Sequence, residues 1–191
     1  TLSVGGDLNV SGNTTYSLKN GTRHLFGMNT KGFNAVEQQK LTASDGASSD
    51  RFGKSVSVYE DYALIGAYYD DSAKGSAYIF KRNGSTWTQQ QKLTASDGAT
   101  YDYFGFSVSL YEDYALIGAF RDDSYIGSAY IFKRIDSTWT QQQKLTASDG
   151  ATGDWFGYSV SVYQDYALIG AYGDDTYRGS AYVFKRNGST W

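Results

Sequence analysis

The chain has 191 residues, enough for one domain with a substantial core, and it contains no cysteine, so disulfides and thiolate metal sites are excluded. Its formal net charge is −3 and the charges are interspersed, which argues against nucleic acid or an anionic membrane as a partner, and no apolar run approaches the ~20 residues of a membrane span. Hydrophobic residues make up 40% of the chain, and many of them are its 18 tyrosines and 10 phenylalanines, a composition that favours β-strands with polar edges.

Residues 1–34 differ in sequence pattern from the rest of the chain. Residues 2–13 alternate apolar and small polar side chains between glycines, which predicts two short strands joined by a turn. Such a hairpin needs a partner surface to be stable. We therefore interpret residues 1–34 as a β hairpin and connector that acts as a docking or assembly segment. The glycine-punctuated strands resemble those of phage tail fibres and fibrous bacterial surface proteins.

From residue 36 onward the chain repeats itself with a period of 52 residues. The Phe-Gly pair that opens each unit begins at Phe52, Phe104 and Phe156. Aligning residues 87–138 with residues 139–190 leaves only 12 differences in 52 positions. A period near 50 residues built from short strands is typical of propellers and other repeat arrays.

Each full period contains four strand signals, here called A, B, C and D. In the middle repeat we expect them at residues 104–110, 114–120, 128–134 and 139–147. Strand B has no polar face and should be buried on both sides, whereas strand D, with Gln, Thr and Lys, should lie at the outer edge. Short links, including an Asn-Gly pair between C and D, predict that neighbouring strands are antiparallel.

The Phe-Gly pair at the start of strand A and the Gly-Ala pair at the end of strand B resemble the FG-GAP repeat, known from integrin alpha subunits and many bacterial exported proteins. The proline that usually follows Gly-Ala is replaced here by Tyr68, Phe120 and Tyr172. The Gln-Lys-Leu-Thr-Ala-Ser-Asp-Gly-Ala stretch is similar to the bacterial branch of that family. The resemblance implies β-propeller blades of four strands each, so together with the repeat we expect an all-β fold of three 52-residue four-stranded antiparallel blades, preceded by the short N-terminal β segment. The blades would occupy residues 35–191, with a D strand at 36–43 and blades beginning at residues 52, 104 and 156.

One departure from the family concerns calcium. Integrin-type repeats often carry a Ca²⁺ loop between strands A and B, but here that link is a tight turn such as Glu112-Asp113. A hard cation needs six to eight oxygens, which such a turn does not supply. We therefore predict no metal and no cofactor. Paired aspartates recur in the B–C and D–A loops of every repeat, as expected if they bond to turn amides; weak cation binding by these loops is the alternative.

An enzymatic role is not expected. The chain has one histidine, no cysteine and no nucleophile elbow, so only carboxylates remain as acid–base candidates. A catalytic centre is normally single, whereas these aspartates recur in every repeat. A non-classical hydrolase is the weaker alternative.

The repeat count predicts an unpaired edge. Residues 36–191 amount to three periods, and the third unit, Phe156 to Arg186, lacks its own D strand, which Val36–Ala43 could supply. Three blades are too few for a closed propeller. Two copies could close a six-bladed ring, the D strand could pass from copy to copy in an open filament, or these residues could be part of a longer polypeptide. The residues expected in assembly are Val36, Gln38, Lys40, Leu41 and Trp191.

Differences between the repeats gather in the D–A and B–C loops, which emerge on the same face of a four-stranded blade. Tyr, Trp and Arg in these loops are residue types that anchor interfaces and stack on sugar rings. The hypothesis is that this face binds a glycan or a cell-surface protein; the alternative is that surface loops simply tolerate change. The candidate ligand-binding residues are Tyr101, Tyr103, Arg121, Tyr125, Trp155, Tyr177 and Arg178.

Together these features favour a non-enzymatic structural or adhesive repeat protein that assembles with copies of itself by strand complementation, as a ring or a filament. We expect it outside the cell or on a cell or virion surface, with no nucleic-acid partner and no membrane insertion. The alternative is a lectin-like propeller that binds carbohydrate or protein through the D–A and B–C loops. An aromatic pocket in every blade would distinguish that alternative.

Overall fold

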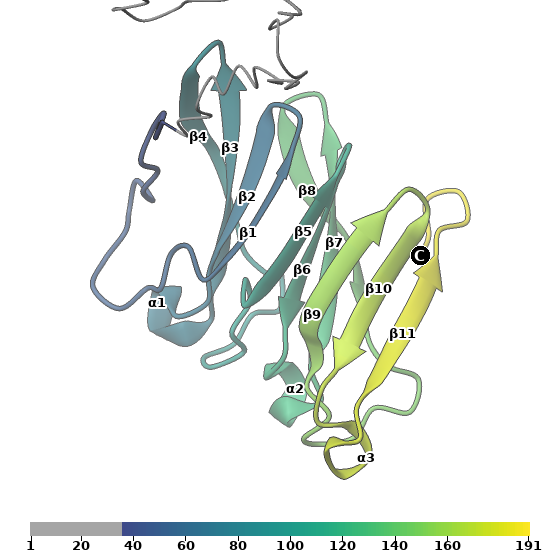
Figure 1. Ribbon diagram of the computed structural model, residues 1–191. Coiled ribbons are helices and arrows are strands. Elements are labelled where there is room, and N and C mark those ends of the chain that lie inside the picture. The colour runs from purple at the N-terminus through teal and green to yellow at the C-terminus, as the bar shows by residue number, and fades with distance from the viewer. Residues whose placement is uncertain (1–35) are drawn as a thin grey trace, which may run out of the picture. The chain divides into compact units, whose positions relative to one another are not determined.

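The computed structural model describes residues 36–191, so the hairpin and connector predicted for residues 1–34 lie outside the described residues. From Gln38 to Trp191 the chain forms one compact unit. Within it, three antiparallel sheets correspond to the three repeats (Figure 1). Sheet 1 consists of β1 (Ser55–Tyr59), β2 (Tyr62–Ala67), β3 (Ser76–Asn83) and β4 (Thr86–Leu93). Sheet 2 consists of β5 (Ser107–Tyr111), β6 (Tyr114–Ala119), β7 (Ser128–Ile135) and β8 (Thr138–Leu145). Sheet 3 consists of β9 (Phe156–Tyr163), β10 (Tyr166–Ala171) and β11 (Ser180–Lys185).

The strands of each sheet are hydrogen-bonded in chain order, as the short links predicted. The main difference from the expected bounds is at strand A of the middle repeat, which begins at Ser107 and not at Phe104. Phe104 instead forms an isolated parallel bridge with Gly75 of the preceding repeat. Phe104 therefore contacts the preceding sheet, while the amide of the next residue, Gly105, bonds to the Gly118 carbonyl of its own sheet at 3.0 Å.

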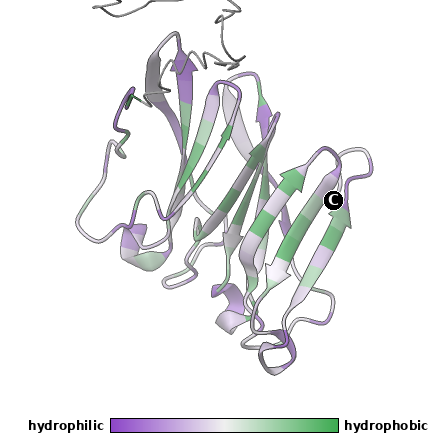
Figure 2. Ribbon diagram, viewed as in Figure 1, coloured by the Kyte–Doolittle hydropathy of each residue, from purple (hydrophilic) through white to green (hydrophobic). Residues whose placement is uncertain are grey.

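The cores lie between neighbouring sheets. Strand β6 is buried at every position, because both of its faces are covered, which confirms the prediction for strand B in the middle repeat, whereas β10 of sheet 3 has one exposed face. One core joins β2 and β3 of sheet 1 to sheet 2 and includes Leu64 and Ile117, both 0% exposed. Another joins sheet 2 to sheet 3 and includes Leu116 and Ile169, also 0% exposed. Figure 2 shows this pattern as apolar bands along the strands and hydrophilic residues at the hairpin tips and helical turns.

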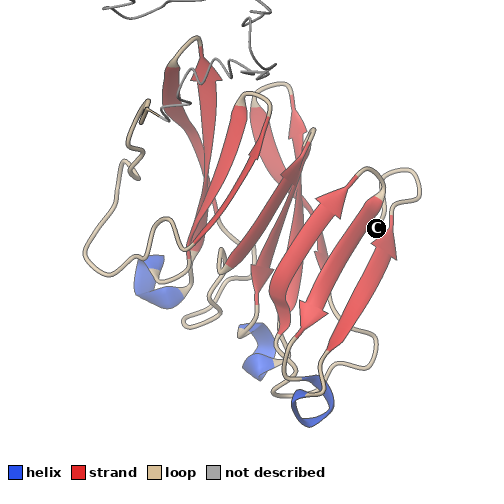
Figure 3. Cartoon of the chain, in the orientation of Figure 1, coloured by secondary structure: helices blue, strands red, loops and turns tan. Residues whose placement is uncertain are grey.

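A short helical turn connects strands B and C in each repeat: α1 (Asp70–Ala73), α2 (Asp122–Tyr125) and α3 (Asp174–Tyr177). All three turns lie at the same end of the strands (Figure 3). In α2, three successive residues have left-handed backbone angles, with φ of 50° at Asp123, 60° at Ser124 and 70° at Tyr125. L-amino acids resist this conformation by roughly 1–2 kcal/mol per residue, so surrounding hydrogen bonds must hold it. None of the helices in residues 36–191 has the length and apolar character needed to cross a bilayer.

Within residues 36–191, sheet 3 has three strands and no strand D, as the repeat count predicted. Its edge strand β11 is consequently open: Ala181 is exposed, whereas the equivalent Ala77 and Ala129 are fully buried. The stretch Val36–Ala43, predicted as a D strand, has no strand assignment in the structure. A β-strand needs backbone hydrogen bonds to a neighbouring strand, and among the described residues no strand C lies beside this stretch to form them.

Candidate functional site: the complementary ends of the repeat array

The Phe-Gly and Gly-Ala pairs are two halves of one contact between neighbouring sheets. A Cβ added to Gly66, at the end of β2, would stand 1.9 Å from the carbonyl oxygen of Gly105 in the next repeat. The hydroxyl of Ser55 donates to that same carbonyl at 2.8 Å. The contact recurs at the second junction, where a Cβ on Gly118 would stand 2.0 Å from the Gly157 oxygen. Each signature glycine is needed because backbone meets backbone there.

An arginine and a tyrosine form the second element of each junction. The guanidinium of Arg134 in β7 lies 4.5 Å over the ring of Tyr62 in sheet 1 and donates to its hydroxyl at 3.2 Å. Arg186 lies 4.6 Å over the ring of Tyr114 and also donates to its hydroxyl. Arg82 is the equivalent residue of sheet 1, and among the described residues its side chain pairs only with Asp61 and the ring of Trp87.

A glutamine and a tryptophan backbone form the third element. The Gln91 side chain donates to the Trp139 carbonyl at 2.7 Å and accepts from the Trp139 amide at 2.8 Å. Gln39 makes the same pair of bonds with Trp87, at 2.9 and 2.8 Å. The N-terminal segment therefore lies against β4 just as β4 lies against β8. It occupies the place of a strand D that belongs to a sheet before sheet 1.

Packing agrees with that position. Leu41 and Ala43 pack on the outward core of sheet 1 beside Tyr78 and Phe80. Leu93 and Leu145, the equivalents of Leu41 in the next repeats, are 1% and 2% exposed. Leu41 remains only half-buried, because the strand C that would cover its other side is absent from the described residues.

A lysine of strand D, two aspartates and a tyrosine form a polar cluster in sheet 1. The ammonium of Lys92 lies 2.6 Å from a carboxylate oxygen of Asp45 and 2.6 Å from one of Asp70. The Tyr78 hydroxyl donates to Asp45 at 3.0 Å. The hydrogen bond from Lys92 lowers the pKa of Asp45. Partial burial favours the neutral amine of Lys92, but its bonds to Asp45 and Asp70 raise the pKa above its usual range.

The same cluster recurs in sheet 2. Lys144 lies 2.6 Å from Asp97 and 2.6 Å from Asp122. Tyr130, which is fully buried, donates to Asp97 at 3.0 Å. Burial is the main cause that raises the pKa of Tyr130, with the negative charges of Asp122 and Asp97 acting in the same direction. In both sheets one lysine thus joins an exposed aspartate to a buried one, Asp70 or Asp122, which would otherwise be buried without a cation.

In sheet 3 no lysine of residues 36–191 completes the cluster. Tyr182 donates to Asp149 at 2.9 Å, and burial, that bond and the charge of Asp174 raise the pKa of Tyr182 to about 12. Neither Asp149 nor Asp174 has an ion pair within residues 36–191. A hollow of about 770 Å³ opens here, lined by both carboxylates together with Asp154 and Ser180 among others. No three acidic or imidazole groups of the described residues gather as a metal site.

The first and last sheets of residues 36–191 therefore expose opposite halves of the contact that joins neighbouring sheets. At the first end Val56 and Val58 are 69% and 66% exposed, although their equivalents Val108 and Leu110 in sheet 2 are buried. At the other end Leu168 and Val183 are 46% and 66% exposed, whereas the equivalents Leu116 and Ile131 are 0% exposed. A Cβ on Gly53 meets no atom within 4 Å, and one on Gly170 meets only Ser159.

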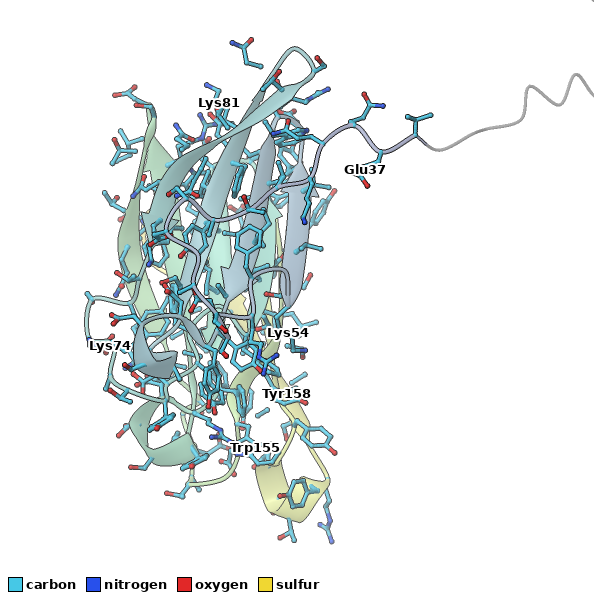
Figure 4. The ribbon with its side chains drawn as sticks, turned by 90° about the vertical axis from the view of Figure 1, so that its left-hand side faces the viewer. Glu37, Lys54, Lys74, Lys81, Trp155 and Tyr158 are labelled. Atoms are coloured by element: carbon cyan, nitrogen blue, oxygen red, sulfur yellow. The ribbon has the colours of Figure 1, made fainter. Side chains whose placement is uncertain are left out.

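The loop residues proposed for ligand binding gather at one end of the strands, as expected, but they differ in accessibility. Tyr103 is 9% exposed and packs under Arg121, whose guanidinium lies 4.4 Å from its ring. Trp155 is half-buried and stacks with Tyr158 at 6.2 Å between ring centroids (Figure 4). The more exposed candidates are Tyr101, Tyr125 and Tyr177 at 56%, 44% and 62%, and Arg178, which pairs with Asp175.

An aromatic pocket does not recur in every repeat. The position held by Tyr103 and Trp155 in sheets 2 and 3 is Arg51 in sheet 1. Among the assembly candidates, Val36, Gln38 and Lys40 are exposed. Trp191 is only 9% exposed, because its ring packs on Tyr114 and its amide bonds to Gln143. The lysine clusters and the arginine–tyrosine contacts were not predicted, although all of their members recur once per period.

Comparison with known proteins agrees with the geometry. No curated protein matches the chain. The FG-GAP repeat matches residues 35–80, 87–132 and 139–184, which together cover more than half of the chain. Each match runs from a D-type stretch into strand C of the following sheet, and the junction contacts join residues of adjacent matches, as Ser55 with Gly105. FG-GAP repeat propellers are generally non-catalytic. The chain therefore belongs to the FG-GAP repeat family.

Proposed function

We propose that the protein is a non-enzymatic structural or adhesive repeat protein that assembles head to tail with copies of itself. In this assembly Gln38–Ala43 of one copy becomes the fourth strand of sheet 3 in the next. The observation that carries the proposal is that the two ends expose opposite halves of a contact that the chain makes twice internally. A location outside the cell or on a cell or virion surface is part of the proposal, on the basis of the exported members of the family.

Donation of this strand requires no change in how it lies on its own sheet 1. Gln39 and Leu41 already make the contacts that β4 and β8 make with the following sheet, while β4 and β8 pair with their own strand C at the same time. The segment is therefore preorganised, and little ordering entropy opposes association.

The remaining pairs follow from the internal junctions. Gly53 of one copy would meet Gly170 of the other as Gly105 meets Gly66. Arg82 would reach Tyr166, which is 47% exposed, as Arg134 reaches Tyr62. The exposed valines of β1 would cover the open apolar face of sheet 3 and remove it from water.

Light scattering on the purified chain over a range of concentrations tests the proposal. A species of twice the 21.0 kDa chain mass would indicate a closed ring of six sheets, and a larger mass that rises with concentration would indicate an open filament. A mass of 21.0 kDa at every concentration would contradict self-assembly.

A matched pair of variants locates the interface. Val183→Asp places a charge on the open face of sheet 3 and should abolish association. Ile135→Asp places the same charge at the β7 hairpin tip, where Ile135 is 61% exposed, close to the 66% of Val183, and should leave association unchanged. Equal association of both variants would place the interface elsewhere.

A second candidate function is binding of a glycan or protein by the loop face, favoured by the exposed tyrosines Tyr101, Tyr125 and Tyr177 at one end of the strands. Alanine at Tyr101 and Tyr125 should then remove binding to glycan arrays or to cells while leaving the assembly mass unchanged. Binding that is the same for this variant and the parent chain would count against this candidate.

A further inference from the structure

We infer that Lys40 of one copy takes the lysine position of the polar cluster in sheet 3 of the next copy, where it lies between Asp149 and Asp174 beside Tyr182. The inference rests on the proposed head-to-tail assembly. It assigns to one exposed lysine the role of fixing the register in which copies join.

The repeat positions identify this lysine. Lys40, Lys92 and Lys144 stand 52 residues apart, at the same place in successive D-type stretches. In sheet 1 the residue opposite Lys92 on β3 is Tyr78, and in sheet 2 the residue opposite Lys144 on β7 is Tyr130. The same register on β11 sets Lys40 opposite Tyr182 and Leu41 opposite Ala181.

The charges at the two ends are complementary. Lys40 is exposed and has no ion pair within residues 36–191. At the other end Asp149 and Asp174 have no cation among the described residues, although their equivalents in sheets 1 and 2 each lie 2.6 Å from a lysine. The nearby cation Arg178 pairs with Asp175 at 3.7 Å and is 82% exposed. The carboxylates therefore remain open to a lysine from outside the sheet.

The Lys40 of the same chain cannot fill the site in this arrangement. Its neighbour Gln39 is bonded to Trp87 in β4, so Lys40 lies on the far side of sheet 1. Sheet 2 separates sheet 1 from sheet 3 (Figure 1). A second copy is thus the occupant that the geometry favours.

The ion pairs would also select the register. A shift of one residue turns every side chain of a strand to the opposite face. It would set Gln39 or Leu41 beside the two carboxylates and leave them without a cation. Apolar faces alone discriminate poorly between neighbouring registers, whereas Asp174, whose equivalents Asp70 and Asp122 have side chains 10% and 8% exposed, would be buried without a cation at a large cost.

Lys40→Met in the full chain tests the inference by light scattering and sedimentation. We expect the association constant to fall at least tenfold while the unfolding midpoint of the single chain is unchanged, because Lys40 makes no ion pair with the described residues of its own copy. The control is Lys81→Met, which removes the same charge from an exposed residue of β3 whose described contact is the Tyr62 ring at 5.5 Å (Figure 4). This control should associate like the parent chain.

A charge swap gives the second measurement. Lys40→Glu and Asp149→Lys should each associate poorly alone, since like charges then meet at the junction. An equimolar mixture should associate, because the carboxylate introduced in the first variant would meet the ammonium introduced in the second. Equal association of the parent chain and Lys40→Met, or no recovery in the mixture, would overturn the inference while self-assembly stands. A parent chain that is monomeric throughout would overturn the proposed function instead.

Discussion

Adding one methyl group to Gly118 should destabilise the fold far more than adding it to Gly170, although both glycines occupy the same repeat position. In the Gly118→Ala variant the new Cβ would stand 2.0 Å from the Gly157 carbonyl oxygen and 2.3 Å from the hydroxyl of Ser107. The first contact is with backbone, so it is relieved only if sheets 2 and 3 move apart at the centre of their junction.

The magnitude follows from two terms. Forcing an extra group into a packed junction costs about 3 kcal/mol where backbone must shift. Loss of the hydrogen bond from Ser107 to the Gly157 carbonyl, which measures 2.7 Å, adds about 1 kcal/mol. We therefore expect Gly118→Ala to lower the unfolding free energy by about 4 kcal/mol, the sum of the two terms.

Gly170→Ala is the matched control. Its Cβ would approach the hydroxyl of Ser159 at 2.4 Å, and this side chain is free to rotate away. Reduced freedom of the unfolded chain offsets the remaining cost, so the net change should stay within about 1 kcal/mol. In the proposed assembly, however, this Cβ would collide with Gly53 of the next copy. Gly170→Ala should therefore fold normally and fail to associate.

Urea unfolding followed by tryptophan fluorescence, at a chain concentration too low for association, measures both variants. Trp139 is 2% exposed in the native structure and reports on the junction between sheets 1 and 2. Equal destabilisation by the two substitutions would refute the reasoning, because the backbone approach of the next repeat would then not be the cause.

Three further predictions concern the junctions and turns. Gln91→Leu leaves the N–H and carbonyl of Trp139 without their side-chain partner, so the unfolding free energy should fall by about 2 kcal/mol and exchange of the Trp139 amide should accelerate; unchanged exchange would argue against this bond. Ser124→Gly places glycine at a position whose φ of 60° is left-handed, which should remove roughly 1–2 kcal/mol of backbone strain. Because this gain outweighs the added freedom of the unfolded chain, Tm should rise. A lower Tm would show that the backbone of Ser124 is not strained. Burial opposes ionisation of Asp97, but the hydrogen bond from Lys144 holds the pKa of Asp97 below its usual value. The stabilisation is therefore present above the unfolded pKa of about 3.9 and is lost as pH falls through the folded pKa. The urea concentration at half-unfolding should be lower at about pH 3 than at pH 7, and Lys144→Met should reduce this difference.

The strands could be predicted because their signal is local. Strand β6 runs over Tyr114–Ala119, against the predicted 114–120, since a run of five small or apolar residues between turn signals fits a strand buried on both faces. The number of strand signals in residues 36–191 also predicted that strand C of sheet 3 would have no strand D beside it. The structural role expected for aspartates is confirmed at Asp102, which accepts from the Ala99 amide at 2.5 Å.

Other features could not be predicted, because their partners lie in other parts of the sequence. Asp122 was expected to bond to turn amides, yet it accepts from Tyr130 and pairs with Lys144 of strand D. The left-handed turn at Asp123–Tyr125 contains no glycine or asparagine, so local propensity argues against it. It is held by the Gly127 amide bonding to the Asp122 carbonyl at 2.9 Å and by the Trp155 amide of the next repeat. Tertiary contacts thus override the local preference.

The regular spacing of the junction contacts has a consequence for the gene. The hydrogen bonds between sheets join residues of adjacent repeats, for example Ser55 with Gly105 and Ser107 with Gly157, each 50 positions apart. Removing or inserting one block of 52 codons would therefore leave every remaining junction with the same partners. The number of sheets per polypeptide is then a trait that selection can adjust in whole steps, without passing through a misfolded intermediate.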